Sequence, residues 1–276
     1  MYIHNIKIYH LDAFTARPFM GNPAAICVSR VPLEEKLMQN ISGEINLSET
    51  AFVVPAAGSG HYTIRWFTSL CEVDLCGHAT LAAAKVLYDF YEKDREKLCF
   101  SSRSGALITQ RCGSAIMLDF PIDEAEEIVG CTPQLLAALG IEHYKRAFIG
   151  KRTRKLVLHI ESEEEVRRLK PDFAKLAALC FDEPVKGLGI TAKGSGSYDI
   201  VVRYFNPWAG VNEDPVTGSV HTLLMDYWGK LLQKEELLSY QASARGGEIR
   251  LKRAANQRVE LWGEAVLLSA GDLYLE

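Results

Sequence analysis

The apolar positions along the chain follow mainly the period of a β-strand. Apolar and polar side chains alternate at 3–9, and 61–68 and 198–205 are further apolar segments of strand length. Two longer apolar stretches, 78–90 and about 220–232, have the length of helices. The pattern therefore predicts an α+β protein with many strands and two long apolar helices.

Turn residues divide the rest of the chain into short elements, with no low-complexity segment and no flexible linker. Further strands are expected at 24–29, 51–54, 98–100, 106–110, 115–120, 147–150, 155–160, 186–192, 248–252, 258–263 and 264–269. Shorter helices are expected at 32–45, 133–139, 162–169 and 173–180.

Two segments of the chain, 64–80 and 202–222, resemble each other. Three pairs of residues match, the first two at a spacing of 138 and the third at 141: Arg65 and Arg203, Phe67 and Phe205, and Gly77 and Gly218. Each copy has the pattern of a strand, a polar turn, a glycine and an apolar helix. Two long units predict two similar halves rather than a solenoid, which needs three or more units.

The boundary between the halves is expected in the acidic, turn-rich segment 121–129. This gives a first lobe of residues 1–121 and a second lobe of residues 122–276. The last strand, near 264–275, is a candidate for return to the first lobe.

A glycine marks the start of each long apolar helix. The first turn of a helix presents unpaired backbone N–H groups and the positive end of the helix dipole. Gly77 and Gly218 carry no side chain that would keep a ligand away from these groups, so the pattern favours a socket for a carboxylate or phosphate. The alternative is that Thr217 or Ser219 simply caps its helix.

Composition excludes several classes of partner. The 276 residues carry a net charge of −4 and a sequence pI of about 6.0, which gives no basic field for nucleic acid or an anionic membrane. No stretch approaches the roughly 20 apolar residues of a membrane span. The first residues lack the pattern of a signal peptide. We therefore expect a cytoplasmic protein that does not bind membrane or nucleic acid.

The cysteines support the same compartment. They are seven in number and scattered, and none forms a CxxC pair or a Cys/His cluster with zinc spacing. Reduced thiols are the expected state. A metal role for His78 is disfavoured, because no partner ligand lies at i+4 or nearby in the sequence. The expectation is therefore no metal.

Six short motifs occur in order along nearly the whole chain: Asp12-Ala13-Phe14, Gly21-Asn22-Pro23, Asn46-Leu47-Ser48-Glu49-Thr50, Cys76-Gly77-His78-Ala79-Thr80, Glu213 to Ser219, and Ser243 to Glu248. Together they resemble the PhzF family of isomerases, named for phenazine biosynthesis. The resemblance implies a diaminopimelate-epimerase-like fold. Its two pseudo-symmetric lobes are each a curled, mostly antiparallel, barrel-like sheet around a central helix, with the active site between them. It also implies a homodimer.

The resemblance implies proton-shift chemistry on a small carboxylate-bearing metabolite without a cofactor. The family's catalytic glutamate falls on Glu49, its Gly-His pair on Gly77 and His78, and its DPVTGS motif on 214–219. A carboxylate suits this role if its pKa lies near working pH.

These roles can be assigned residue by residue. We expect Glu49 to be the acid/base, while His78 and Asp214 orient the substrate or relay a proton. The substrate carboxylate is expected to be held by the remaining predicted site residues: Ser48, Gly77, Gly218 and Ser219. Each has a plainer alternative, such as a solvated glutamate or a structural histidine.

Two other functions stay open. A cysteine-based racemase would need a thiolate from each half, but Thr217 stands where the second half should match Cys76, so this chemistry is disfavoured. A non-catalytic member of the same fold would bind a metabolite or a protein. The presence of Glu49, His78 and Asp214 argues against that alternative.

Overall fold

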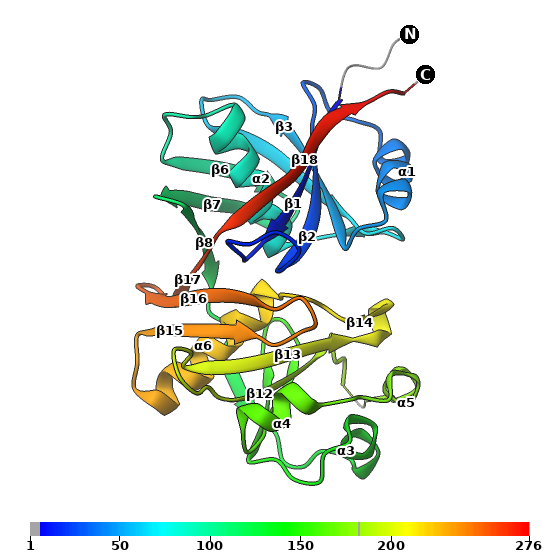
Figure 1. The fold of residues 1–276 in the computed structure, drawn as a ribbon, viewed down its shortest axis with the longest axis vertical. Coiled ribbons are helices and arrows are strands. Elements are labelled where there is room, and N and C mark those ends of the chain that lie inside the picture. The colour runs from blue at the N-terminus through cyan, green and yellow to red at the C-terminus, as the bar shows by residue number, and fades with distance from the viewer. Residues whose placement is uncertain (1–5, 182, 276) are drawn as a thin grey trace. The chain divides into compact units, whose positions relative to one another are not determined.

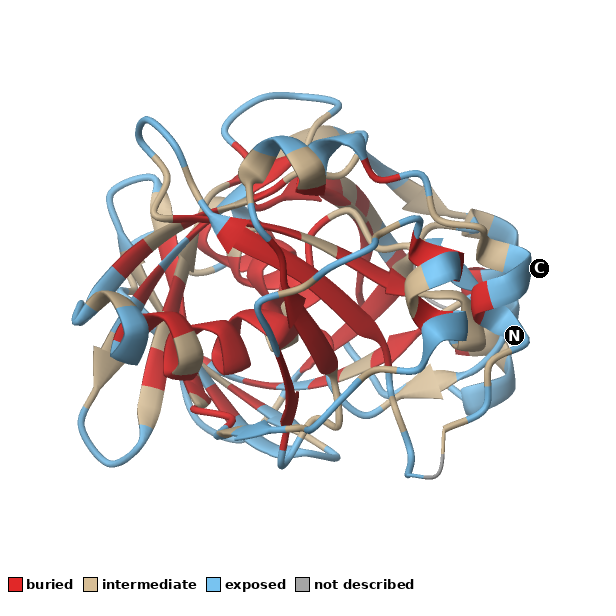
Figure 2. Cartoon of the chain, turned by 90° about the horizontal axis from the view of Figure 1, so that it is seen from below, coloured by how far each residue is buried: buried red, intermediate tan, exposed pale blue. Residues whose placement is uncertain are grey.

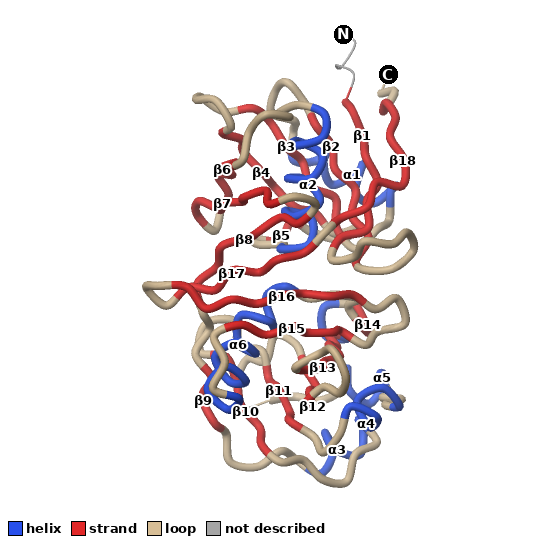
Figure 3. The backbone as a smooth tube through the Cα atoms, turned by 60° about the vertical axis from the view of Figure 1, so that its left-hand side comes forward, coloured by secondary structure: helices blue, strands red, loops and turns tan. Residues whose placement is uncertain are grey.

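The computed structural model describes residues 6–181 and 183–275, so the beginning of the first expected strand lies outside the described residues. The chain divides into two compact units. The first is Met1–Phe120 together with Glu260–Glu276, and the second is Pro121–Val259. Strands dominate both units, and each contains one long helix, as Figures 1 and 3 show.

The first unit is a mixed sheet with two helices. Its elements are β1 (Ile6–Ala13), β2 (Asn22–Val28), α1 (Glu35–Ile45), β3 (Glu49–Pro55), β4 (His61–Phe67), β5 (Glu72–Val73), α2 (Gly77–Phe90), β6 (Lys97–Ser102), β7 (Gly105–Cys112), β8 (Ala115–Pro121) and β18 (Ala265–Leu273), with the end of β17 (Arg258–Gly263). The pairing β1–β2 is antiparallel, β2–β3 parallel, β3–β4 antiparallel and β4–β6 parallel. The last strand, β18, pairs with β1 along its length.

The second unit repeats this plan. Its elements are β9 (Ala125–Glu127), α3 (Pro133–Leu139), β10 (Arg146–Gly150), β11 (Leu156–His159), α4 (Glu163–Arg168), α5 (Phe173–Ala177), β12 (Leu188–Lys193), β13 (Ile200–Asn206), a 3-10 turn (Pro207–Ala209), β14 (Val211–Glu213), α6 (Gly218–Leu232), β15 (Glu236–Gln241) and β16 (Gly247–Ala254). The pairing β10–β11 is antiparallel, β11–β12 parallel, β12–β13 antiparallel and β13–β15 parallel.

The register of the two sheets agrees residue for residue with the repeat in the sequence. In the first unit Thr50 pairs with Phe67, and in the second Leu188 pairs with Phe205, so both members of the pair are 138 residues further along. The predicted two-fold repeat of strand, turn and helix is therefore confirmed.

Burial explains why α2 and α6 are apolar on all sides. Each helix packs against strands of its own unit, and every residue from His78 to Tyr88 except Lys85 is buried. Figure 2 shows the buried parts of the chain in red. A helix with an apolar surface all round is typical of a core position. The two helices start at Gly77 and Gly218, as the glycine pattern predicts.

Four strands are missing from the sequence prediction: β5, β9, β14 and β15, of which β5 and β14 have only two and three residues. β9 lies in the acidic segment expected to be a turn, where it pairs with β10 along an exposed edge. β15 is the next element after α6, and its alternation of buried and more exposed residues extends over only six residues. No helix in the described part of the chain is long and apolar enough to cross a membrane.

Candidate active site

The centre of the site is a contact between Glu49 and His78. Glu49 is the first residue of β3, and its carboxylate is about one-fifth exposed. His78 is the second residue of α2 and is buried. The ring Nε2 of His78 lies 3.1 Å from Oε2 of Glu49. The fold thus brings two of the three predicted catalytic residues into direct contact.

The opposite side of the His78 ring is held by Asn22. Asn22 is fully buried at the start of β2, and its side-chain amide nitrogen lies 3.2 Å from Nδ1 of His78. An amide can present either its nitrogen or its oxygen, so Asn22 can serve either tautomer or a doubly protonated ring. His78 is therefore fixed on both nitrogens.

Cys76 completes this cluster. It is the N-cap residue of α2 in an extended conformation, and its sulfur lies 3.5 Å from Nδ1 and 3.9 Å from Nε2 of His78. The carbonyl oxygen of Cys76 accepts a hydrogen bond from the Thr80 hydroxyl at 2.6 Å. The thiol is thus beside the ring and is buried with it.

The cluster tests the expectation that His78 has no other metal-binding side chains nearby. Glu49, Cys76 and His78 offer atoms that lie within 4.8 Å of one another, so the argument from sequence spacing was wrong. The partners come from another strand and from the position two residues before. However, the sulfur is almost equally far from both ring nitrogens, which places it off the line of the Nε2 lone pair. The side chains would have to move before they could share one ion.

Charge within the cluster favours an ion pair. Burial lowers the pKa of His78, but the charge of Glu49 and its hydrogen bond raise that pKa above its usual value. Burial and the Glu49 charge raise the pKa of the Cys76 thiol, so the thiol is neutral and the Glu49 carboxylate is the anion that holds the imidazolium. A neutral buried thiol is a poor nucleophile.

Two predicted substrate-binding residues flank this pair. Ser48 directly precedes Glu49 and is half-buried, and Gly77 is the first residue of α2. The Gly77 and His78 N–H groups belong to the first turn of the helix, where backbone donors have no acceptor within the helix. The first unit thus combines a carboxylate, an imidazole and a helix N-terminus.

The other predicted residues lie in the second unit. Asp214 follows β14, its backbone N–H donates to the Tyr204 carbonyl at 3.0 Å, and its carboxylate accepts from the Thr217 hydroxyl. Thr217 is the N-cap residue of α6, but its side chain makes no capping bond, so the simple helix-cap alternative is wrong for this residue. Gly218 and Ser219 form the first turn of α6.

Gln241 holds this turn through two hydrogen bonds and was not among the predicted site residues. Its amide nitrogen donates to the Asp214 carbonyl at 2.7 Å, and its amide oxygen accepts from the Thr217 N–H at 2.9 Å. Asn22 was likewise not among the predicted site residues, although it lies in the Gly21-Asn22-Pro23 motif. A buried amide next to a glycine or a turn leaves no periodic signal in the sequence.

The register of the two units shows that only the first has a carboxylate at the position of Glu49. Glu49 precedes Thr50, and its counterpart is Gly187, which precedes Leu188. The backbone of Gly187 has φ +124°, and a Cβ atom there would lie 1.8 Å from the Tyr204 hydroxyl oxygen. A glutamate cannot occupy this position without moving Tyr204.

The remaining members of the cluster are also replaced in the second unit. At the helix starts, Cys76 and His78 correspond to Thr217 and Ser219. The chemical groups of the first unit are therefore not duplicated.

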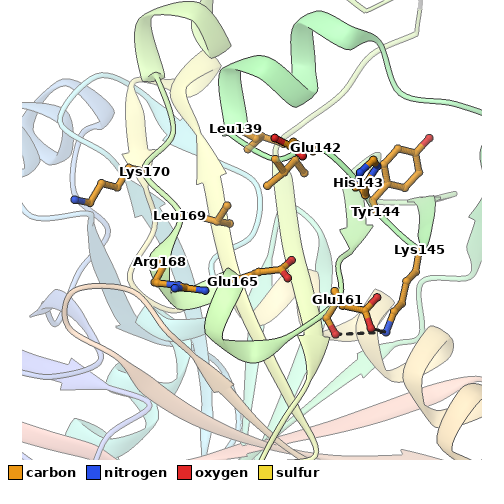
Figure 4. Close-up of a pocket in the computed structure, with 12 residues that line it drawn as sticks. Leu139, Glu142, His143, Tyr144, Lys145, Glu161, Glu165, Arg168, Leu169 and Lys170 are labelled. Atoms are coloured by element: carbon orange, nitrogen blue, oxygen red, sulfur yellow. Dashed lines mark hydrogen bonds and ion pairs between the residues drawn. The ribbon is translucent and has the colours of Figure 1, made fainter.

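A separate hollow in the second unit contains none of the predicted residues. It has a volume of about 640 Å³ and is lined by residues 139–145 together with Glu161, Glu165 and 168–170. Figure 4 shows charged side chains of both signs around it, with Lys145 and Glu161 paired at 3.0 Å. Nothing in this lining resembles the contact between Glu49 and His78.

Nearly the whole chain matches a known protein family. The family model PhzC-PhzF, described as phenazine biosynthesis-like protein, matches residues 11–271. An uncharacterized isomerase of Pseudomonas aeruginosa is 47% identical over 270 residues, which cover 98% of this chain and 99% of that protein. The crystal structure of a PhzF-family phenazine biosynthesis protein from Enterococcus faecalis is 42% identical, covers 99% of this chain and 100% of its own, and superposes with a TM-score of 0.91.

A more distant likeness concerns the fold alone. A hydroxyproline epimerase from Agrobacterium vitis is 10% identical, with a TM-score of 0.63 over 100% of this chain and 94% of its own. The predicted α+β class of the diaminopimelate-epimerase type, with two similar lobes around central helices, is confirmed.

Proposed function

Because the chain belongs to the phenazine biosynthesis-like PhzC-PhzF family, we propose that it is an isomerase that moves a proton within a small carboxylate-bearing metabolite. Glu49 is the acid/base of this reaction. The observation that carries the proposal is the 3.1 Å contact between Glu49 and His78 in a first unit whose counterpart lacks both groups.

The contact suits a carboxylate that takes a proton and returns it. Glu49 removes a proton from a carbon of the substrate, and the electron pair of the broken C–H bond forms a new double bond. The electron pair of a conjugated double bond in the substrate then takes the proton from Glu49 at a second atom of the substrate. No electrons or atoms are gained or lost, so the reaction needs no cofactor. A positioned acid/base of this kind typically contributes a factor of about 10²–10⁴ in rate.

His78 supports Glu49 in this cycle. Its imidazolium attracts the Glu49 carboxylate across the 3.1 Å contact and orients it before the proton is taken. The positive end of the α2 dipole opposes charge on His78, but by only about 0.3–1 kcal/mol. The ion pair orients the Glu49 carboxylate, and the proton taken from the substrate stays on Glu49 until it is returned.

The same geometry disfavours a two-thiol racemase. Such an enzyme needs an ionised sulfur in each unit, and the second unit offers Thr217. Burial and the Glu49 charge raise the pKa of Cys76, which keeps the first thiol neutral. A single carboxylate that both removes and returns the proton agrees with these observations.

The substrate carboxylate is proposed to bind to backbone N–H groups at helix starts. Gly77 in the first unit, and Gly218 with the Ser219 hydroxyl in the second, have the required donors. Ser48 and Asp214 would contribute polar contacts to the substrate. A cytoplasmic homodimer acting in a biosynthetic process, with no membrane or nucleic-acid partner, completes the proposal.

The test is a search for turnover. The protein would be incubated in D₂O with dihydro-hydroxyanthranilate and with other small cyclic and acyclic carboxylates, and products would be analysed by mass spectrometry. An isomerised product or uptake of deuterium into carbon is expected for at least one compound. If no compound reacts but one raises the melting temperature, the alternative of a non-catalytic metabolite-binding protein is supported instead.

A further inference from the structure

Trp66 has a feature that the other tryptophans of the chain do not share. The sequence contains four tryptophans, and three have an indole N–H with an acceptor. These bonds are Trp208 to the Leu179 carbonyl, Trp228 to the Thr191 hydroxyl, and Trp262 to the Glu260 carboxylate. Trp66 is 1% exposed, and its Nε1 has no acceptor among the residues that the structure describes.

An indole N–H can only donate, and burying one without an acceptor is unfavourable. Most buried donors in folded proteins are paired, so an exception calls for an explanation. A donor that is held ready for a ligand would be such an explanation. The position of Trp66 in the sheet indicates which ligand could accept this hydrogen bond.

The strand register places Trp66 beside Glu49. Trp66 on β4 lies directly opposite Ala51 on β3, and Glu49 is two residues from Ala51. Residues two apart in a strand point to the same face. Trp66 and Glu49 are therefore diagonal neighbours on one face, a distance that aromatic and long side chains can span.

The opposite face of these strands has another role. Phe52 and Phe67, each next in sequence to Ala51 and Trp66, belong to the core cluster that includes Met38 and Ile41 of α1. Side chains alternate between faces along a strand. Glu49 and Trp66 are thus on the side away from α1, where His78 of α2 contacts Glu49.

The second unit shows how far an aromatic side chain at this register reaches. The counterpart of Trp66 is Tyr204, which pairs with Gly189 as Trp66 pairs with Ala51. The Tyr204 hydroxyl oxygen lies 1.8 Å from the place where a Cβ atom of Gly187, the counterpart of Glu49, would be. In the second unit the aromatic tip thus occupies the space that an acid side chain at this register would take.

The two aromatic tips differ in their partners. Tyr204 is closed off by protein groups, because its hydroxyl donates to the Lys186 carbonyl at 2.8 Å and accepts from the Lys155 ammonium at 2.6 Å. Trp66 has no equivalent acceptor among the described residues. On the face that carries Glu49, the first unit therefore has an unpaired donor where the second unit has a hydroxyl paired with protein groups.

We propose that the indole N–H of Trp66 donates a hydrogen bond to an acceptor oxygen of the substrate, either its carboxylate or a carbonyl conjugated to the reacting carbon. This inference rests on the proposed proton shift at Glu49 and adds a substrate-contacting residue to it. When Glu49 removes a proton from carbon, negative charge spreads toward such an oxygen. A preorganised donor stabilises that charge more strongly than it stabilises the ground state.

The test uses Trp66→Phe, which keeps an aromatic ring and deletes the N–H. Trp228→Phe is the matched control, because Trp228 is equally buried but has a bonded N–H. In the free protein, Trp66→Phe should lower the melting temperature less than Trp228→Phe, because both variants lose the same buried ring volume but only Trp228→Phe loses a bonded N–H. With the carboxylate that wild-type protein converts, Trp66→Phe should reduce kcat/KM by about 10- to 100-fold.

A second readout does not depend on turnover. The indole N–H signals in a ¹H–¹⁵N spectrum would be followed while dihydro-hydroxyanthranilate, benzoate and the rest of the carboxylate panel are titrated. The signal that Trp66→Phe removes should move, and the signals of Trp208 and Trp228 should stay.

Three outcomes would overturn the role of Trp66. They are a melting temperature of Trp66→Phe lowered as far as that of Trp228→Phe in the absence of ligand, an unchanged kcat/KM, or an indole signal that no carboxylate shifts. If no carboxylate is converted, the proposed isomerase function fails by itself. The titration then still decides whether Trp66 contacts a bound carboxylate.

Discussion

His78 Nε2 and Glu49 Oε2 lie 3.1 Å apart, although they come from the start of α2 and the start of β3. Glu49 can carry a proton, and the charge of His78 depends on the charge of this neighbouring carboxylate. The consequences of this contact can be measured in stability, in pH dependence and in turnover.

The first prediction concerns the alkaline side of the stability profile. Burial lowers the pKa of His78, but the charge and hydrogen bond of Glu49 raise it above its usual value of 6.5. Stability from this pairing is fully present below pH 6.5 and is lost as pH rises through the folded-state pKa. We expect His78→Gln to remove this alkaline loss, as measured by urea unfolding at a series of pH values. Equal slopes for wild type and variant would show that His78 is neutral in the folded protein.

The second prediction concerns the acid side and involves His221. This fully buried residue of α6 has both ring nitrogens in hydrogen bonds, to the Thr217 carbonyl at 2.7 Å and to the Ser239 hydroxyl at 2.9 Å. Burial lowers the pKa of His221 to about 4. Its contribution is therefore present above pH 6.5 and is lost as pH falls toward 4, by about 3 kcal/mol in total. A His221→Gln variant should be less stable at pH 7 and show a flatter decline between pH 6.5 and 4.

The third prediction tests the asymmetry between the units. Gly187→Ala places a Cβ atom against the Tyr204 hydroxyl at a strained φ, and should destabilise the protein by about 2–5 kcal/mol. Gly196→Ala is the control, because Gly196 also has a positive φ but has nothing within 4 Å of an added Cβ. It should cost only the backbone strain, about 1 kcal/mol. Similar melting temperatures for both variants would mean that Tyr204 moves aside freely.

The fourth prediction concerns the thiol next to His78. Burial and the Glu49 charge raise the pKa of Cys76, so the thiol stays neutral and takes no part in proton transfer. Cys76→Ala should therefore keep kcat within about tenfold of wild type, as measured by steady-state turnover of the compound found in the carboxylate panel. A variant as inactive as one without Glu49 would revive thiol chemistry.

Much of the fold follows from sequence patterns that are local or periodic. The apolar run of 78–90 predicts α2, and the match of Arg65 and Phe67 with Arg203 and Phe205 predicts the repeated register. The six ordered motifs, through the family that they resemble, predict that Glu49 and His78 belong to one site. Their contact could be confirmed only in the structure, because it joins a strand and a helix that no periodicity connects.

The features that escaped prediction depend on single long-range contacts. Asn22 and Gln241 act through buried amides, which look like any loop or strand residue in the sequence. The missing acid at Gly187 becomes visible only when β12 is aligned with β3 by its pairing. The placement of Asp214, Gly218 and Ser219 around a substrate stays a prediction.

The central claim is that Glu49 carries the proton, and the most direct measurement compares Glu49→Gln with Glu44→Gln in D₂O. Glu44 is an exposed glutamate of α1 and serves as the matched control. With the reactive carboxylate, Glu44→Gln should match wild type in product formation and deuterium uptake. Glu49→Gln should keep the fold and lose both by at least about 10²-fold. Wild-type exchange by folded Glu49→Gln would contradict the account, and another group would then have to be the base.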